Sequence, residues 1–303
     1  MLPCRTISLA TGIVLATLAL DASALTLNAS ATWSLDGGAS STDIDSAPPG
    51  TYADVLNSAN SSTSSVFYHV GGNDGGYYAS RVSGDGQFDI TGHWHSSTEF
   101  TNTLGTAASF NYGLLIENGE LSINLPGTAG LNGLASYVMT LSLNSSEIGR
   151  SERSLTLDAS NTVVLSPVTG FDLGGTYDAS LASYSWGSYT TNFALGTFAA
   201  GASFTIDVDV VTRASLDAVN NTCGGGGGGG GQVDIAAVGG DGTGGGLGLC
   251  GATARFGDPP NVTGNPGGSG GSVTGNAIPE PGSLALVGLG LVTVLASRRR
   301  RPA

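Results

Sequence analysis

The feature that most constrains the fold of this chain is an alternation of apolar and other residues that recurs throughout residues 25–257. Successive side chains of a β-strand point to opposite faces of a sheet, so a period of two predicts a strand with one buried face. The clearest series are Leu25, Leu27, Ala29, Ala31, Trp33 and Leu35; Phe88, Ile90, Gly92 and Trp94; and Phe204, Ile206, Val208 and Val210. No segment of this region keeps the 3.6-residue period of an amphipathic helix. The sequence therefore predicts an all-β fold.

Clusters of Gly, Asn, Asp and Ser separate these segments and predict turns. The Asn118-Gly119 dipeptide, between two apolar segments, favours a two-residue hairpin turn. Many short strands joined by turns are typical of antiparallel sandwiches. We therefore predict one antiparallel β-sandwich or jelly-roll-like domain over residues 25–257.

The charge of this region limits what it can bind. Between Leu25 and Pro279 there are 21 acidic residues and five arginines, which leaves a net charge of −16, and the chain contains no lysine. Nucleic acids are bound largely through cationic contacts to phosphate, so we predict no nucleic-acid function. The absence of lysine also excludes a P-loop and Schiff-base catalysis.

The N-terminus has the pattern of a secretory signal. Arg5 is followed by the mostly apolar residues 7–20 and then by Ala22-Ser23-Ala24, an A-x-A site for signal peptidase. We predict a signal peptide over residues 1–24, cut between Ala24 and Leu25, which would remove Cys4. A buried N-terminal helix is the alternative.

The C-terminus combines a linker with a short apolar segment. Residues 258–277 are mostly Pro, Gly, Ser, Thr and Asn, which predicts a flexible linker. Residues 278–303 then contain Pro279-Glu280-Pro281, the thirteen apolar residues 284–296, and four arginines, Arg298, Arg299, Arg300 and Arg301. As a helix, the apolar segment would span roughly 20 Å, short of a membrane core of roughly 30 Å, although local thinning can accommodate it. The positive-inside rule predicts cytoplasmic arginines and an external body.

This tail resembles the PEP-CTERM sorting signal of Gram-negative bacteria, in which the motif, an apolar helix and a basic end follow in this order. The resemblance implies recognition and cleavage by a membrane sorting enzyme of the exosortase type. Pro279, Glu280 and Pro281 would be recognition residues, and the body would be held transiently at the inner membrane on its periplasmic or extracellular side. A plain C-terminal anchor is the alternative. Similar tails are also labelled as the C-terminal region of ice-binding proteins, but a repeated Thr-x-Thr ladder is missing here.

Two cysteines remain after removal of the signal, Cys223 and Cys250, and the segment between them is rich in glycine. Disulfides persist in exported proteins, so we predict that this pair is bonded. In the chain-entropy model such a bond stabilises by roughly 3–4 kcal/mol.

Two groups of residues are candidate metal ligands. His93 and His95 are two apart on a predicted strand, so both imidazoles share a face and, with Glu99, could bind Zn²⁺ or Cu²⁺. Asp85 and Asp89, near a glycine-containing turn, could bind Ca²⁺. The alternatives are an ordinary polar strand face and a solvated hairpin.

The sequence offers no complete catalytic set. Glu99, Glu117 and Glu120 could serve a glycosidase only if two of them lay across one bond. Aromatic residues able to stack on sugars include Tyr77, Tyr78, Tyr184, Trp186 and Tyr189, although strands also favour aromatics in general. We therefore predict a non-catalytic exported protein of the envelope or exopolysaccharide matrix. The alternatives are a lectin-like polysaccharide-binding module, with or without Ca²⁺, and a polysaccharide hydrolase.

Overall fold

The computed structural model of the chain describes residues 20–48, 51–73, 78–124, 132–158, 160, 162–217, 251–257 and 270–277. Most of these residues lie in strands, and none of them is helical. Every strand pairing among them is antiparallel. The prediction of an all-β, antiparallel fold is therefore confirmed.

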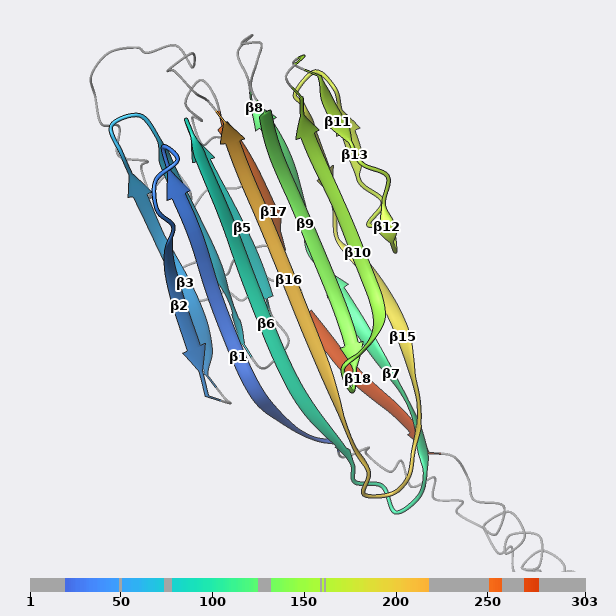
Figure 1. Ribbon diagram of the computed structural model, residues 1–303. Helices are drawn as coiled ribbons and strands as arrows, with labels where there is room; N and C mark the ends of the chain where they lie inside the picture. Colours follow the sequence, from blue (N-terminus) through green and yellow to red (C-terminus); the bar gives the residue numbers. More distant parts are fainter. Residues whose placement is uncertain are drawn as a thin grey trace, which may run out of the picture.

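The strands form three sheets (Figure 1). Sheet A has the order β11 (Val163–Leu165), β10 (Ser146–Leu157), β9 (Asn132–Leu143), β16 (Ser203–Asp217), β6 (Phe88–Asn102), β1 (Leu20–Leu35) and β2 (Ser41–Ala47), with β12 (Thr169–Gly170) paired to β10. Sheet B has the order β13 (Thr176–Asp178), β14 (Ser183–Trp186), β8 (Gly119–Asn124), β17 (Gly251–Phe256), β5 (Tyr78–Asp85), β4 (Ser65–Asn73) and β3 (Tyr52–Asn60). Sheet C has the order β15 (Tyr189–Phe198), β7 (Ala108–Ile116) and β18 (Gly270–Ala277).

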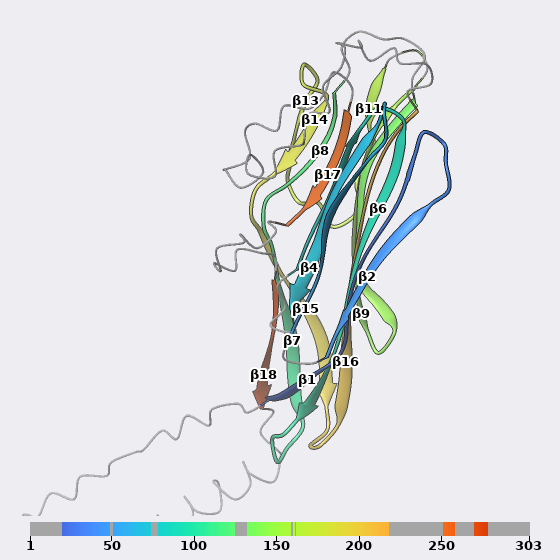
Figure 2. The same cartoon turned by 90° about the vertical axis from the view of Figure 1, so that its left-hand side faces the viewer.

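The sheets form two layers, with sheet A on one side and sheets B and C on the other (Figure 2). The apolar faces predicted by the alternation meet between them in one core. Tyr137 of sheet A packs on Phe256 of sheet B with ring centroids 5.1 Å apart, and Phe204 of sheet A packs on Phe110 of sheet C at 5.4 Å. Burial of these faces is the main source of stability in such an arrangement.

One hydroxyl pair crosses this core. Ser80 of β5 and Thr212 of β16 are both fully buried, and their hydroxyl oxygens lie 2.6 Å apart. Because one hydroxyl donates to the other, the pair satisfies its hydrogen bonding between the two sheets. The contact helps to fix sheet B against sheet A at this point.

The predicted hairpin at Asn118-Gly119 is wrong. β7 lies in sheet C and β8 in sheet B, so the strands on either side of this dipeptide do not pair with each other. Gly119 instead belongs to β8 and lies opposite Trp186 of β14. A two-residue hairpin connection occurs between β9 and β10, where Asn144 and Ser145 have φ of 50° and 66°, the left-handed values that a type I′ turn requires.

The structure differs from the predicted linker over its last eight residues. Gly270–Ala277 forms β18, which pairs with the open edge of β7. A segment of this composition has little apolar surface to bury, but as an edge strand it also gains main-chain hydrogen bonds. Residues 258–269 lie outside the described part of the chain.

β1 begins before the predicted signal cleavage site. Ala22 and Ala24 lie opposite Phe100 and Thr98 of β6, and the register shifts between Ala24 and Thr26. Removal of residues 1–24 would leave the end of β6 paired only with β16. The signal peptide stays a prediction.

Several predicted features lie outside the described residues. These are the Cys223–Cys250 bond, the apolar segment 284–296, the PEP motif and the terminal arginines. Within the described ranges, no helix has the length and apolar character needed to cross a membrane.

Candidate functional site on the outer face of sheet A

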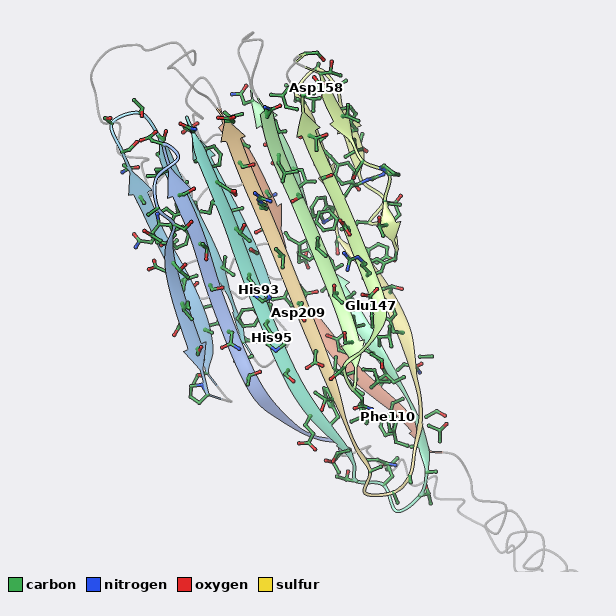
Figure 3. All side chains as sticks on the ribbon, in the orientation of Figure 1. His93, His95, Phe110, Glu147, Asp158 and Asp209 are labelled. Carbon is green, nitrogen blue, oxygen red and sulfur yellow. The ribbon has the colours of Figure 1, made fainter. Side chains whose placement is uncertain are left out.

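The outer face of sheet A is polar along its two central strands. β6 and β16 are direct neighbours, with His95 opposite Asp209 and Ser97 opposite Asp207. The odd-numbered residues of both strands face away from the core. The even-numbered residues face inwards, and two of them, Trp94 and Val210, are fully buried. This face brings together side chains more than 100 residues apart in sequence (Figure 3).

Two histidines share one carboxylate oxygen at the centre of this face. His93 Nε2 lies 3.1 Å from Asp209 Oδ1, and His95 Nδ1 lies 3.0 Å from the same atom. All three side chains are partly exposed. Figure 3 shows them side by side on the front of sheet A. We call these three residues the His–Asp–His cluster.

The cluster shifts the protonation of its members. Burial alone would raise the pKa of the Asp209 carboxyl, but hydrogen bonds from His93 and His95 outweigh it and hold this pKa well below its usual value. The hydrogen bond to Asp209 raises the pKa of His95 above its usual value, although burial opposes it. The cluster therefore favours an ionised carboxylate beside a protonated His95.

The structure does not bring Glu99 to the two histidines, as the possible zinc or copper site would require. Glu99 is four residues beyond His95 on the same strand, which corresponds to roughly 13 Å. The carboxylate beside the imidazoles belongs to Asp209, which is 114 residues from His95 in sequence, so the spacing of the histidines does not reveal it. Within the residues that the structure describes, no group of three His, Cys, Asp or Glu side chains is arranged to hold a metal ion.

The structure also separates the two candidate calcium ligands, Asp85 and Asp89. Asp85 ends β5 of sheet B, while Asp89 lies in β6 of sheet A. Each has the outward parity of its strand, so the two carboxylates face opposite sides of the molecule. Arg213 Nε and Nη2 donate to both oxygens of Asp89, at 3.0 and 2.6 Å. The link between these aspartates joins the two layers and is not a hairpin.

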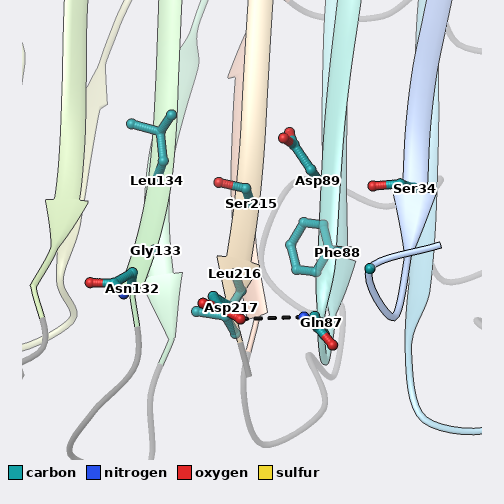
Figure 4. A pocket seen from close by; sticks show the side chains of 11 residues that line it. Ser34, Gln87, Phe88, Asp89, Asn132, Gly133, Leu134, Ser215, Leu216 and Asp217 are labelled. Atoms are coloured by element: carbon teal, nitrogen blue, oxygen red, sulfur yellow. Dashed lines mark hydrogen bonds between the residues drawn. The ribbon is translucent and has the colours of Figure 1, made fainter. Parts of the chain in front are cut away.

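A groove lies at one end of the polar face (Figure 4). Its volume is about 450 Å³, and its polar lining residues are Ser34, Gln87, Asp89, Asn132, Ser215 and Asp217. Gln87 Nε2 donates to Asp217 Oδ1 at 3.3 Å, across the strand ends. Hydroxyl, amide and carboxylate groups of this kind can hydrogen-bond to a hydroxyl-rich ligand.

Three of the five candidate sugar-stacking aromatics are buried, and a fourth, Tyr189, is partly buried. Tyr78, Tyr184 and Trp186 are buried in the core, and the Tyr189 ring stacks on Phe171 at 5.5 Å. Tyr184 and Trp186 are two apart on β14 and therefore share its inward face. Tyr77 lies outside the described residues.

The three glutamates considered for catalysis are distributed over different parts of the fold. Glu99 is on the outer face of sheet A, Glu120 is on the outer face of sheet B, and Glu117 lies in the link between β7 and β8. Glu99 and Glu120 thus lie on opposite sides of the molecule and cannot act on one bond.

We expect the substitution Asp209→Asn to lower the free energy of unfolding by about 1 kcal/mol near pH 5.5 and by less near pH 9, because the groups are partly exposed and screened. The raised pKa of His95 gives a stabilisation that is present below the unfolded-state value of about 6.5 and is lost as pH rises through the folded value. The lowered pKa of Asp209 gives a stabilisation that is present above about 3.9 and is lost on acidification. The stabilisation from His95 and the stabilisation from Asp209 are therefore both present between about pH 4 and 6.5.

Urea unfolding at pH 5.5 and pH 9 measures this difference. Glu99→Gln, on the same face of β6, is the matched control and should show no comparable pH dependence. An equal loss of stability at both pH values in Asp209→Asn would contradict the proposed ionisation.

Comparison with known proteins identifies one part of the chain. Residues 277–301 match the PEP-CTERM protein-sorting motif. The resemblance found in the sequence is therefore confirmed, with boundaries close to the predicted tail. Searches of curated proteins and of solved structures found no match.

Proposed function

We propose that this chain, a PEP-CTERM protein, is a non-catalytic component of the cell envelope or extracellular matrix that exosortase recognises and cuts at its tail. The observation that carries the proposal is the sorting motif over residues 277–301. The motif implies export and passage through a membrane-bound stage. The four terminal arginines then favour a cytoplasmic C-terminus before processing.

The position of the motif relative to the fold supports this role. β18 ends at Ala277, and only Ile278 separates it from Pro279. The folded body would therefore sit close to the membrane while the tail is still attached. Cleavage at the motif would release or transfer a domain whose strands are already paired.

The distribution of acidic residues supports a role without catalysis. Glu99 and Glu120 face opposite sides of the molecule, and Asp89 is neutralised by Arg213. A structural or binding role needs no pair of carboxylates across a bond.

A second candidate function is polysaccharide binding in the groove of sheet A. Its hydroxyl, amide and carboxylate lining favours this candidate. Recognition would depend mainly on hydrogen bonds, because no Tyr or Trp is among the residues that line the groove. A glycan array tests the idea with the paired variants Ser215→Leu, in the groove, and Ser154→Leu, outside it on the same sheet. Loss of a glycan signal in Ser215→Leu alone would support the groove, and equal signals would exclude it.

The main proposal predicts that the combined variant Pro279→Ala, Glu280→Gln, Pro281→Ala is exported but keeps its tail. Intact mass spectrometry of the protein recovered from membranes and medium would show the processed form for the parent chain and a tail-containing membrane form for the variant. The same spectra report removal of residues 1–24 and the loss of two hydrogens on disulfide formation. Glu147→Gln, at an exposed position near the start of β10, is the control. Processing of the motif variant like the parent chain would overturn the proposal.

A further inference from the structure

The outer face of sheet B carries two adjacent arginines. Arg81 of β5 and Arg255 of β17 are directly opposite each other in the antiparallel register. Their neighbours in sequence, Val82 and Ala254, are fully buried, so both arginines point away from the core. Directly opposite residues have Cβ atoms about 5 Å apart. Two of the five arginines of a strongly acidic body therefore share one small area.

These two arginines differ from the other three in the body. Arg150 and Arg213 each have a carboxylate oxygen at 2.6 Å, and Arg153 has one at 3.7 Å. Among the described residues, no carboxylate lies within 4.0 Å of Arg81 or Arg255. The Nε atom of each is buried without a hydrogen-bond partner, although both side chains are partly exposed.

The surroundings hold this pair in place without neutralising it. The Arg81 guanidinium lies over the ring of Phe67, 5.5 Å from its centroid. Glu120 is opposite Arg255 on β8, outside ion-pair distance. Asp54, farther along the face, is engaged by His69 at 3.1 Å. Burial lowers the pKa of Arg81, the neighbouring Arg255 lowers it further, and Glu120 opposes the change.

Such an arrangement costs free energy in the absence of a ligand. Like charges directly opposite on a sheet repel, and a partly buried guanidinium without a partner loses hydration. An oxyanion removes both costs, because guanidinium groups donate paired hydrogen bonds to carboxylate or sulfate oxygens. Because the body as a whole carries a net charge of −16, a polyanion can bind it only where cationic groups are concentrated.

We propose that Arg81 and Arg255 together form a binding site for the carboxylate or sulfate groups of an acidic polysaccharide on the outer face of sheet B. The oxyanion chemistry follows from the two guanidiniums. The choice of a polysaccharide as its source rests on the proposed envelope or matrix function. The site lies on the opposite side of the molecule from the groove in sheet A.

Affinity electrophoresis of the exported, purified protein in gels that contain polygalacturonate, dextran sulfate or neutral dextran tests the proposal. We expect retardation by at least one of the two charged polymers, weakening steeply with salt, and none by dextran. Arg81→Gln and Arg255→Gln should each weaken binding by about 10-fold or more. The control Arg213→Gln, on sheet A, should bind like the parent. Polygalacturonate and dextran sulfate distinguish a carboxylate from a sulfate ligand.

Thermal unfolding shows whether a variant that binds more weakly is still correctly folded. Without polymer, Arg81→Gln should melt at or above the parent temperature, because repulsion is relieved. The bound polymer should raise the melting temperature of the parent chain and of Arg213→Gln. The proposal is overturned if neither charged polymer binds the parent, if dextran binds equally well, or if Arg213→Gln loses as much affinity as the two sheet B variants. Tail processing is measured separately, so its failure would not be confused with failure of this site.

Discussion

Replacement of Asn102 by Asp is expected to lower the free energy of unfolding by about 3–5 kcal/mol at pH 7. Asn102 is fully buried at the end of β6. Its Nδ2 donates to the carbonyl oxygens of Thr106, Phe198 and Ala199, each at 3.0 Å, while its Oδ1 accepts from Leu104 N at 3.1 Å. In the variant, a carboxylate oxygen would face three carbonyl oxygens, with no donor between them.

Urea unfolding monitored by circular dichroism measures this loss. The matched control is Asn192→Asp, the same chemical change at an exposed position of β15, for which we expect a change within about 0.5 kcal/mol. The buried carboxyl should have a raised pKa, so the difference from the parent should shrink as pH falls and a proton restores one donor. Similar losses in both variants would show that the hydrogen bonds of Asn102 do not stabilise the link after β6 and the end of β15.

The strand content of this fold could be predicted from the sequence because the alternation of apolar and polar residues within each strand shows that one of its faces is buried. Ile206, Val208 and Val210 are buried, and the polar residues between them face outwards. Alternation requires only local information about which side of a strand meets the core. The predicted all-β class follows from this information alone.

The partners of each strand could not be predicted in the same way. β16 pairs with β6 and β9, which precede it by many strands, so the link between Asp209 and His95 depends on the register of distant segments. The histidine pair was recognisable from its spacing, but its carboxylate was not. A spacing of two residues shows that two side chains share a face of a strand, but it does not show which residues of the neighbouring strands lie beside them.

Aromatic residues illustrate the same limit. Tyr184 and Trp186 looked equally suited to a sugar-binding surface and to a core, because the alternation of β14 places both on one face without saying which. Their burial follows from the position of β14 in sheet B, where Trp186 contacts Tyr137 of sheet A with ring centroids 4.9 Å apart. Only the tertiary packing decides between the two faces.

The substitution Gly119→Ala is expected to destabilise the protein by about 3 kcal/mol, a large effect for one methyl group. A Cβ atom at this position would lie 1.9 Å from Cζ2 and 2.3 Å from Cε2 of Trp186. The indole is nearly fully buried and packs on Tyr137 and Phe256, so it cannot move aside without disturbing the core. Overpacking of this kind typically costs 1–3 kcal/mol and can cost more. The glycine that suggested a hairpin is therefore required here for close packing.

Chemical unfolding, monitored by tryptophan fluorescence, tests whether the clash with Trp186 causes this loss. The control is Gly187→Ala, at the residue that follows Trp186 in sequence. A Cβ atom at position 187 would have no neighbouring atom within 4 Å, so Gly187→Ala should change stability by less than about 0.5 kcal/mol. Trp186→Leu removes the clashing ring atoms, and in that background Gly119→Ala should cost about 1 kcal/mol or less. The resulting coupling energy, about 2 kcal/mol, would be the signature of a direct contact. Additive losses would show that Gly119 is needed for its backbone conformation instead, and that Trp186 does not determine the residue opposite it.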